Sequence, residues 1–313
     1  MEGVVVIKNN NTILHIFKNM YKHKYLMAML FIGIVYFALF HYGPMYGIQI
    51  AFKDYKIRSG MLRSEWVGLK HFRSLFVSRD FINVTRNTLI ISFYKLIFGF
   101  PAPIIFALLI NELAGKFFKK IIQTVSYLPH FLSWVILAGV FIQILSPSRG
   151  AVNYIISIFG GKPIYFLGNN DWFRLTLVIT SIWKNFGWGS IIYLASISSI
   201  SPELYEAAII DGAGRFRQVW SITLPSLLPV ISIMFIFSSG SLINDDFDQI
   251  FNLYNEAVYR VGDVLSTYTY RQGLVRMQYS YTTAVGLFKN VVAFVLILLT
   301  NFAASKFSDY GIW

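Results

Sequence analysis

Six long apolar stretches constrain the fold of this chain more than any other feature of its sequence. A helix that crosses the hydrocarbon core of a bilayer, about 30 Å thick, needs about 20 mostly apolar residues. Six stretches reach that length, at residues 25–46, 87–110, 125–145, 175–197, 224–243 and 282–301. The sequence therefore predicts an all-α membrane protein with six transmembrane helices.

The composition agrees with a membrane protein and excludes several chemistries. Of the 313 residues, 56% are hydrophobic and 13% are charged, and this charged share is about half that of a soluble domain. The lack of cysteine excludes disulfides, iron–sulfur clusters and thiol nucleophiles. The net charge of +12 comes from lysines and arginines scattered among apolar runs. It therefore fits lipid headgroups or an anionic solute better than nucleic acid.

The N-terminal segment and the loops bear on how the chain sits in the membrane. We predict a cytoplasmic, interfacial segment at residues 1–24, with a frayed basic tail as the alternative, followed by one transmembrane domain over residues 25–310. An even number of spans puts both termini on one side, and the lysines before the first span favour the cytoplasm. The loop at residues 53–86, which would then face outward, is also basic, so charge bias alone favours this orientation only weakly.

A polar loop at residues 201–223 joins the fourth and fifth predicted spans. Ser201 suits an N-cap and Pro202 a first helical position, which predicts a short helix. Gly212 and Gly214 then end this helix before a second short one. One face of the first helix is formed by Leu204, Ala207, Ala208 and Asp211. The alanines leave a shallow surface on which another protein's backbone can come close. A plain connecting turn is the alternative, but it would need only a few residues.

The loop resembles the EAA loop of binding-protein-dependent ABC importer permeases. Glu206-Ala207-Ala208 is followed after three residues by Gly212 and, after nine more, by Ile222-Thr223-Leu224-Pro225. Stretches such as "GIQIAFKDY", "WVGLKHF" and "TAVGLF" are similar to the carbohydrate-importer branch, in particular to the group with oligosaccharide and alginate-type importers.

This resemblance implies that the loop is a cytoplasmic coupling helix that docks on an ATPase subunit. The coupling residues would be Glu203, Leu204, Glu206, Ala207, Ala208, Asp211, Gly212 and Gly214. The resemblance further implies a pore completed by a second homologous permease, two ABC ATPase subunits that bind ATP and Mg, and an extracytoplasmic solute-binding protein. The implied location is the cytoplasmic (inner) membrane of a prokaryote, with both termini in the cytoplasm.

Catalytic motifs are absent from the sequence. No G-x-x-x-x-G-K-[ST] occurs, so the chain lacks the phosphate-binding loop that ATP hydrolysis requires. No H-E-x-x-H, G-x-S-x-G or clustered metal ligands occur either, and the five histidines fall singly. We therefore predict a transport subunit that is not an enzyme and binds no metal or cofactor of its own.

Three lysines, Lys95, Lys184 and Lys289, lie inside predicted spans. A charged side chain at membrane depth costs about 2.5 to 3.5 kcal/mol on insertion scales and usually faces a partner or a wet cavity. Each lysine lies roughly eight to ten residues from the outer end of its span, which is about 12 to 15 Å deep. We predict that the lysines line a solute path. Snorkelling towards the outer headgroups is the alternative.

Aromatic and polar residues in the fourth and fifth spans extend the predicted path. They are Trp183, Trp188, Ser238, Ser241 and Asn244. Aromatic rings can stack on the C–H faces of a sugar, and hydroxyl or amide groups can exchange hydrogen bonds with its hydroxyls. Packing between helices through small and polar residues is the alternative.

Charge along the path suggests the kind of sugar. Lysines in the path would favour a negatively charged solute, which predicts an acidic oligosaccharide such as a chain of uronic acids, with neutral glycans left open. Asp245, Asp246 and Asp248 at the outer mouth would repel such an anion unless basic groups neutralise them. Pairing with arginine or lysine of external loops or of a docked binding protein is the role that we expect for these acids.

Together these features predict the permease subunit of an ATP-driven oligosaccharide importer. The alternative is a self-sufficient secondary carrier or channel for a polar solute, in which the loop at residues 201–223 would be a gate. Such carriers often contain inverted repeats with interrupted helices, and no convincing repeat occurs in this sequence.

Overall fold

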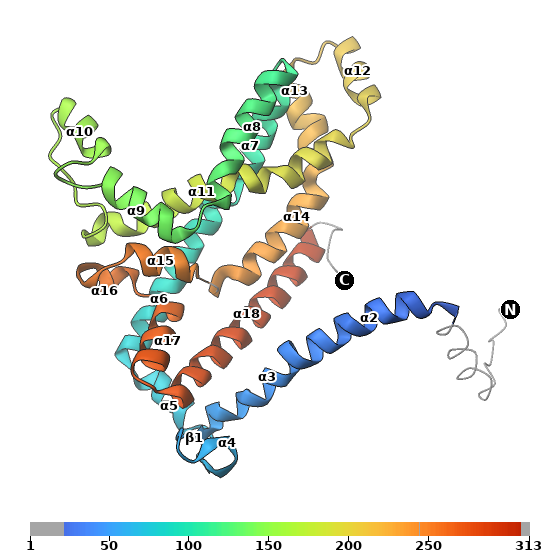
Figure 1. The fold of residues 1–313 in the computed structure, drawn as a ribbon. Helices are drawn as coiled ribbons and strands as arrows, with labels where there is room; N and C mark the ends of the chain where they lie inside the picture. Colours follow the sequence, from blue (N-terminus) through green and yellow to red (C-terminus); the bar gives the residue numbers. More distant parts are fainter. Residues whose placement is uncertain (1–21, 244, 308–313) are drawn as a thin grey trace.

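The computed structural model describes residues 22–243 and 245–307, and almost all elements in these ranges are helices (Figure 1). The only strands there, β1 (Lys53–Asp54) and β2 (Glu65–Trp66), form a two-residue antiparallel pair around the short helix α4 (Gly60–Arg63). The predicted all-α membrane fold is confirmed. The predicted segment at residues 1–24 lies almost entirely outside the described residues.

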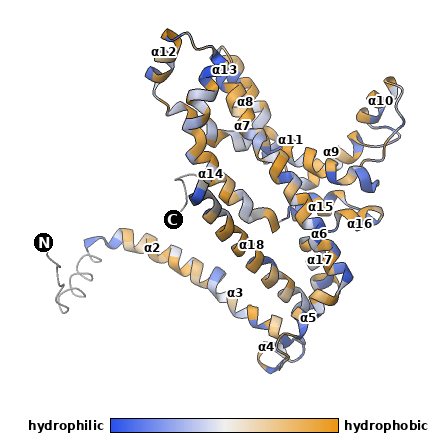
Figure 2. Cartoon of the chain, turned by 180° about the vertical axis from the view of Figure 1, so that it is seen from behind, coloured by the Kyte–Doolittle hydropathy of each residue, from blue (hydrophilic) through white to orange (hydrophobic). Residues whose placement is uncertain are grey.

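The first predicted span forms an arm that stands away from the rest of the chain (Figure 1). It consists of α2 (Lys24–Phe37), η1 (Ala38–Tyr42), α3 (Gly43–Met45) and η2 (Tyr46–Phe52). Figure 2 shows apolar residues along most of this arm, and none of its most apolar window is buried within the subunit. Only the end of the arm packs on the rest of the chain, where Ala51 is fully buried. A helix that is apolar all round needs lipid or another protein to cover it.

The second helical stretch contains a π-helical turn in its middle. The connecting helix α5 (Lys70–Val77) leads into α6 (Arg79–Tyr94), whose start is capped because Ser78 Oγ accepts the N–H of Phe81 at 3.3 Å. The turn η3 (Lys95–Gly99) then joins α6 to α7 (Pro101–Glu112). Turns of this kind are frequent at functional sites, and this one begins at Lys95.

The third predicted span, residues 125–145, is not one straight helix. α8 (Lys116–Phe131) and α9 (Trp134–Ile144) meet at an angle of 104°. The break lies at Leu132 and Ser133, which both have extended backbone, and Ser133 Oγ caps α9 by accepting the N–H of Ile136 at 3.4 Å. The predicted single span is therefore corrected to a pair of helices that change direction within the stretch.

Helix α11 (Asn170–Ser198) is the central element and packs against α7, α8 and α14. The backbones of α11 and α8 come close together at Gly187, where an added Cβ would lie 2.1 Å from the carbonyl oxygen of Ser126. At Gly189 an added Cβ would lie 3.2 Å from the Cβ of Pro103 in α7. Small residues allow helices to approach this closely in membranes. The two glycines thus bring α7 and α8 against α11.

The remaining elements complete the bundle and connect its helices. A lobe containing α10 (Ala151–Ile158) connects α9 to α11, and α12 (Pro202–Ile210), α13 (Arg215–Gln218) and η4 (Val219–Thr223) connect α11 to α14 (Leu224–Gly240). The last elements are η5 (Ser241–Ile243), α15 (Phe247–Leu253), η6 (Glu256–Val258), α16 (Tyr259–Gly262), α17 (Leu265–Tyr270), η7 (Arg271–Val275) and α18 (Tyr279–Phe307). Figure 1 shows α12 and the α4–α17 region at opposite ends.

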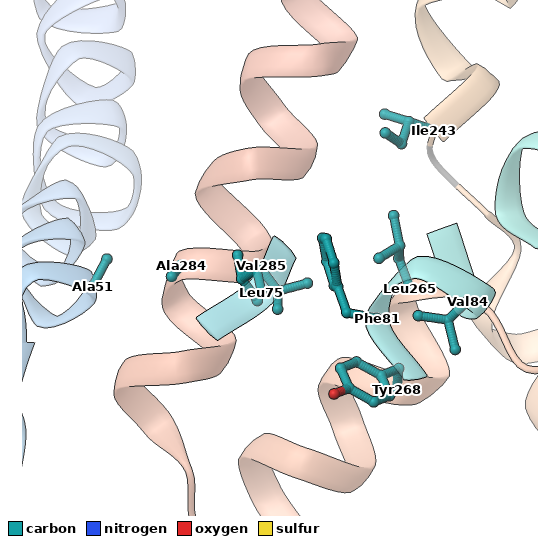
Figure 3. Packing of buried hydrophobic residues seen from close by; sticks show 9 residues of the cluster. All are labelled: Ala51, Leu75, Phe81, Val84, Ile243, Leu265, Tyr268, Ala284 and Val285. Atoms are coloured by element: carbon teal, nitrogen blue, oxygen red, sulfur yellow. The ribbon is translucent and has the colours of Figure 1, made fainter. Parts of the chain in front are cut away.

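Three clusters of buried apolar residues hold these helices together. The first joins the end of the arm to α5, α6, α17 and α18, and includes Leu75, Phe81 and Val285 (Figure 3). The second packs α11 on α9 and α15 around Leu177, and the third packs α11 on α7 and α14 around Leu227. Because α11 contributes to two of the three clusters, its packing positions α9 and α15 as well as α7 and α14.

The described residues contain four helical stretches long and apolar enough to cross a membrane, namely Lys24–Phe52, Arg79–Glu112, Arg215–Gly240 and Tyr279–Phe302. The bent pair α8–α9 would make a fifth if it counts as one span. Helix α11 is 29 residues long but is not among them, because polar residues such as Lys184 and Asn185 interrupt its apolar runs. The count of six spans remains a prediction.

Candidate functional site

The loop between α11 and α14 forms two short helices, as the sequence predicts. α12 projects beyond the bundle in Figure 1 and has no buried residue. Pro202 occupies its first turn, and Ser201 stands at the N-cap position but makes no capping bond with its side chain. Glu203 and Glu206 are both exposed. A helix with no buried residue in its own subunit has most of its surface open to another molecule.

Gly212 ends α12 with a left-handed backbone conformation, which no other residue of the loop adopts. Its φ is +75°, in the left-handed region that favours glycine. The N–H of Gly212 donates to the carbonyl of Ile209 at 3.0 Å, and the N–H of Ala213 donates to that of Ala208 at 2.8 Å. These two bonds form a Schellman motif. Gly214 has φ −66° instead, which any residue can adopt, so left-handed backbone in this loop is confined to Gly212.

The exposed surface of α12 as a whole is more apolar than the alanines alone indicate. Leu204 is 51%, Ile209 62% and Ile210 86% exposed, beside the open positions of Ala207 and Asp211. Exposed large apolar side chains gathered on one short helix indicate a contact surface. Sequence reasoning missed the two isoleucines, although their position directly before Asp211 and Gly212 was available as a signal.

A hydrogen bond ties α12 to the start of α14. The hydroxyl oxygens of Tyr205 and Thr223 are 2.9 Å apart, and Thr223 is buried. Thr223 is the last residue of η4 and α14 follows directly, so this contact joins α12 to the start of α14.

A cavity of about 800 Å³ opens between α6–α7, α11 and α14. The residues of its wall that carry a polar group are Ser92, Lys95, Ser181, Asn185, Trp188, Tyr193, Ser238 and Asp246. Apolar side chains such as Phe100 and Met234 form much of the remaining wall. A mostly apolar cavity with a few polar groups is typical of a small-molecule site.

The cavity includes some of the predicted path residues and leaves out others. Lys95, Trp188 and Ser238 line it. Trp183 does not, because its ring contacts Phe141 of α9, with ring centres 5.5 Å apart. Ser241 begins η5, and Asn244 lies outside the described residues.

Ser181 and Asn185 of α11, which sequence reasoning missed, complete the polar wall beside the predicted Trp188. Ser181, Asn185 and Trp188 recur at intervals of four and three residues and therefore share one helix face. Asn185 Oδ1 lies 3.2 Å from Nδ1 of His130, whose ring stacks on Trp188 at 4.9 Å between centres. This spacing was available in the sequence as a signal that Trp188, and not Trp183, shares the helix face that lines the cavity.

Lys95 is held at the cavity wall by an ion pair and an amide. Its ammonium donates to Asp246 Oδ2 at 2.6 Å and to Gln249 Oε1 at 2.5 Å. Lys289 of α18 donates to Asp245 Oδ1 at 3.2 Å, and the Asp245 side chain is only 1% exposed. Asp245 and Asp246, two of the three acids expected to pair with external groups, are thus paired instead with lysines of two helical stretches.

Lys184 has a different environment from the other two lysines. Its ammonium donates to the backbone carbonyls of Pro129, at 3.4 Å, of His130, at 3.1 Å, and of Leu132. These carbonyls end α8 at the 104° bend. Lys184 also reaches a smaller cavity of about 380 Å³, which it shares with Asn185, Asp246 and Phe247. Its main contacts therefore stabilise the broken helix pair, where the C-terminal carbonyls attract a cation.

Within the described residues, no group of three or more His, Cys, Asp and Glu side chains is arranged to hold a metal ion.

Comparison with known proteins identifies the class of molecule. The family model described as "Binding-protein-dependent transport system inner membrane component" matches residues 99–308. The chain belongs to this family. The predicted resemblance to ABC importer permeases is therefore confirmed, and so is the prediction that the chain is a transport subunit and not an enzyme.

Several relatives match the permease over nearly its whole length. In Bacillus subtilis (strain 168), the polygalacturonan/rhamnogalacturonan transport system permease protein YteP is 45% identical over 93% of this chain and 91% of its own. Protein LplB of the same strain is 44% identical over 93% of this chain and 92% of its own. A chain in the crystal structure of a bacterial alginate ABC transporter, in complex with an alginate pentasaccharide-bound periplasmic protein, is 42% identical. That match has a TM-score of 0.87 and covers 95% of the permease and 99% of the other chain.

Proposed function

We propose that this permease forms the membrane path of an ABC importer for acidic oligosaccharides. The observation that carries the proposal is the match, at 42–45% identity over more than nine tenths of the chain, to permeases of polygalacturonan/rhamnogalacturonan and alginate systems. Polygalacturonan and alginate are both chains of uronic acids. The cavity supports a sugar ligand because it combines the Trp188 ring with the Ser181 hydroxyl, the Asn185 amide and the ammonium of Lys95.

The proposed assembly follows from the two exposed apolar surfaces and the family. The α12 end faces the cytoplasm, where one of two ABC ATPase subunits, which bind ATP and Mg, covers Leu204, Ile209 and Ile210. The arm Lys24–Phe52 contacts lipid and a second homologous permease. The α4–α17 end receives an extracytoplasmic solute-binding protein. α11 serves as the sixth span, and both termini lie in the cytoplasm of a prokaryote.

In the proposed mechanism, ATP-driven closure of the ATPase subunits moves α12. The Tyr205–Thr223 bond passes this movement to α14, and α14 carries Met234 and Ser238 in the cavity wall. Rotation of α14 against α11 then opens the cavity to one side of the membrane at a time. Glu206, exposed on α12, pairs with a basic residue of the ATPase.

Substrate-stimulated ATP hydrolysis by the reconstituted complex tests the proposal. We expect a binding protein loaded with an oligogalacturonate to raise the ATPase rate several-fold, and the same chain with its carboxyl groups reduced to alcohols to raise it much less. Stimulation by neutral chains only would contradict the acidic substrate and leave the transporter assignment standing. A subunit that purifies alone and transports without ATP would instead be a secondary carrier or channel.

A further inference from the structure

The Lys95–Asp246 ion pair lies where the two cavities meet. Asp246 lines both the larger and the smaller cavity, and Lys95 lines the larger one. The Lys95 ammonium is therefore at the wall of the space proposed for the sugar, and a carboxylate of the protein already occupies it at 2.6 Å. We propose that this pair is a latch: a carboxylate of the sugar replaces Asp246 on Lys95 and so selects acidic sugars. This inference rests on the proposed function.

Lys95 is built to stay in place when Asp246 leaves. Its second acceptor, Gln249 Oε1, belongs to a side chain that is fully buried. Gln249 Nε2 donates to the carbonyl of Leu177 at 2.7 Å and to Thr180 Oγ1 at 2.9 Å, both in α11. The amide therefore has a fixed orientation with its oxygen towards the ammonium, so the cation remains aimed at the cavity.

Asp246 is built to be exchanged. Its side chain is 49% exposed, and among the described residues its carboxylate accepts a hydrogen bond only from Lys95. It stands at the N-cap position of α15 without making a capping bond. The neighbouring Asp245 is the opposite case, because it is buried and bonds both Lys289 and the backbone N–H of Ser266, at 3.0 Å. Asp246 can therefore turn into water, where its carboxylate is hydrated, while Lys95 keeps its bond to Gln249 Oε1.

The exchange discriminates by charge. An incoming uronate carboxylate accepts the same charge-assisted hydrogen bond that Asp246 gives up, so Lys95 stays paired throughout. A neutral sugar offers only hydroxyl groups, which carry no charge to pair with the ammonium, and these do not displace a carboxylate. The latch therefore stays closed on a neutral chain even where the chain fits the cavity.

Direct binding to the permease, without the binding protein, tests the latch. The probe is fluorescent trigalacturonate, and the carboxyl-reduced trimer is the neutral control. Fluorescence polarisation follows binding of each trimer to the purified complex of the permease with its partner subunits. We expect Lys95→Met to weaken binding about tenfold, as for loss of one charged hydrogen bond, and Lys95→Arg to retain it. Asp246→Asn removes the internal competitor and strengthens binding. Lys162→Met, which removes an exposed lysine far from the pair in sequence, has no effect.

The opposite signs of the two variants distinguish a latch from a structural ion pair. A structural pair would make Lys95→Met and Asp246→Asn change binding in the same direction, and that result would overturn the latch. Equal binding of the acidic and the reduced trimer to the wild-type complex would overturn it as well. If the loaded binding protein still stimulates ATP hydrolysis in either case, the proposed transport function survives while the latch does not.

Discussion

Replacing Gly212 by valine is expected to lower sugar uptake about tenfold or more while the subunit still inserts and assembles. A residue with a Cβ at φ +75° is strained by about 1–2 kcal/mol, and a β-branched side chain resists this conformation further. The Schellman turn that ends α12 would open, and α12 would meet the ATPase at the wrong angle. The measurement is uptake and ATP hydrolysis by the same vesicles, and we expect hydrolysis to continue without uptake.

The loop supplies a matched control for this variant. Gly214 lies two residues away, has φ −66°, and, like Gly212, has nothing within 4 Å of an added Cβ. Gly214→Val therefore makes the same change in size without the backbone strain, and uptake should stay close to that of the wild type. Equal losses in the two variants would show that bulk, rather than the conformation of Gly212, matters to coupling.

Replacing Lys184 by methionine is expected to destabilise the permease by about 3 kcal/mol or more, because a buried acceptor left without a donor costs about 1–3 kcal/mol. The side chain is 8% exposed and bonds three carbonyls at the end of α8. Methionine fills similar space but donates nothing, so the bend between α8 and α9 loses its support. Thermal unfolding of the detergent-solubilised complex and proteolysis at residues 132–133 measure the effect.

Lys95→Met is the comparison for Lys184→Met. Lys95 also lies in a predicted span, but its loss leaves one buried acceptor, Gln249 Oε1, and a half-exposed Asp246 that water can hydrate, so the unfolding temperature should fall less than for Lys184→Met. If Lys184→Met unfolds like the wild type and only transport suffers, Lys184 belongs to the solute path and not to the helix junction.

The sequence predicted the features that local patterns determine. The apolar runs predicted helices, and Pro202 and Gly212 predicted the start and end of α12, because capping and left-handed backbone depend on the residues at those positions. Pro129 and Ser133 are local signals for the bend after α8. They lie within a continuous apolar run, however, and such a run predicts one span.

The environment of the lysines could not be predicted from local patterns. Lys289 is 44 residues from Asp245, and Lys95 is 151 from Asp246, so the pairs exist only through the packing of distant helices. Lys184 bonds carbonyls, which every residue carries and no sequence pattern marks. Three similar lysines at a similar predicted depth therefore have two distinct kinds of partner, acids for two of them and a helix end for the third.

The proposed coupling requires that α12 lies on the cytoplasmic side and is covered by an ATPase subunit. The chain contains no cysteine, so Ile210→Cys introduces one thiol into this subunit, at a side chain that is 86% exposed. A membrane-impermeant maleimide is added to sealed vesicles of each orientation, with and without the ATPase subunits. We expect labelling only from the cytoplasmic face, and we expect bound ATPase subunits to slow this labelling strongly. Labelling from the outer face, or labelling at the same rate with and without the ATPase, would contradict it.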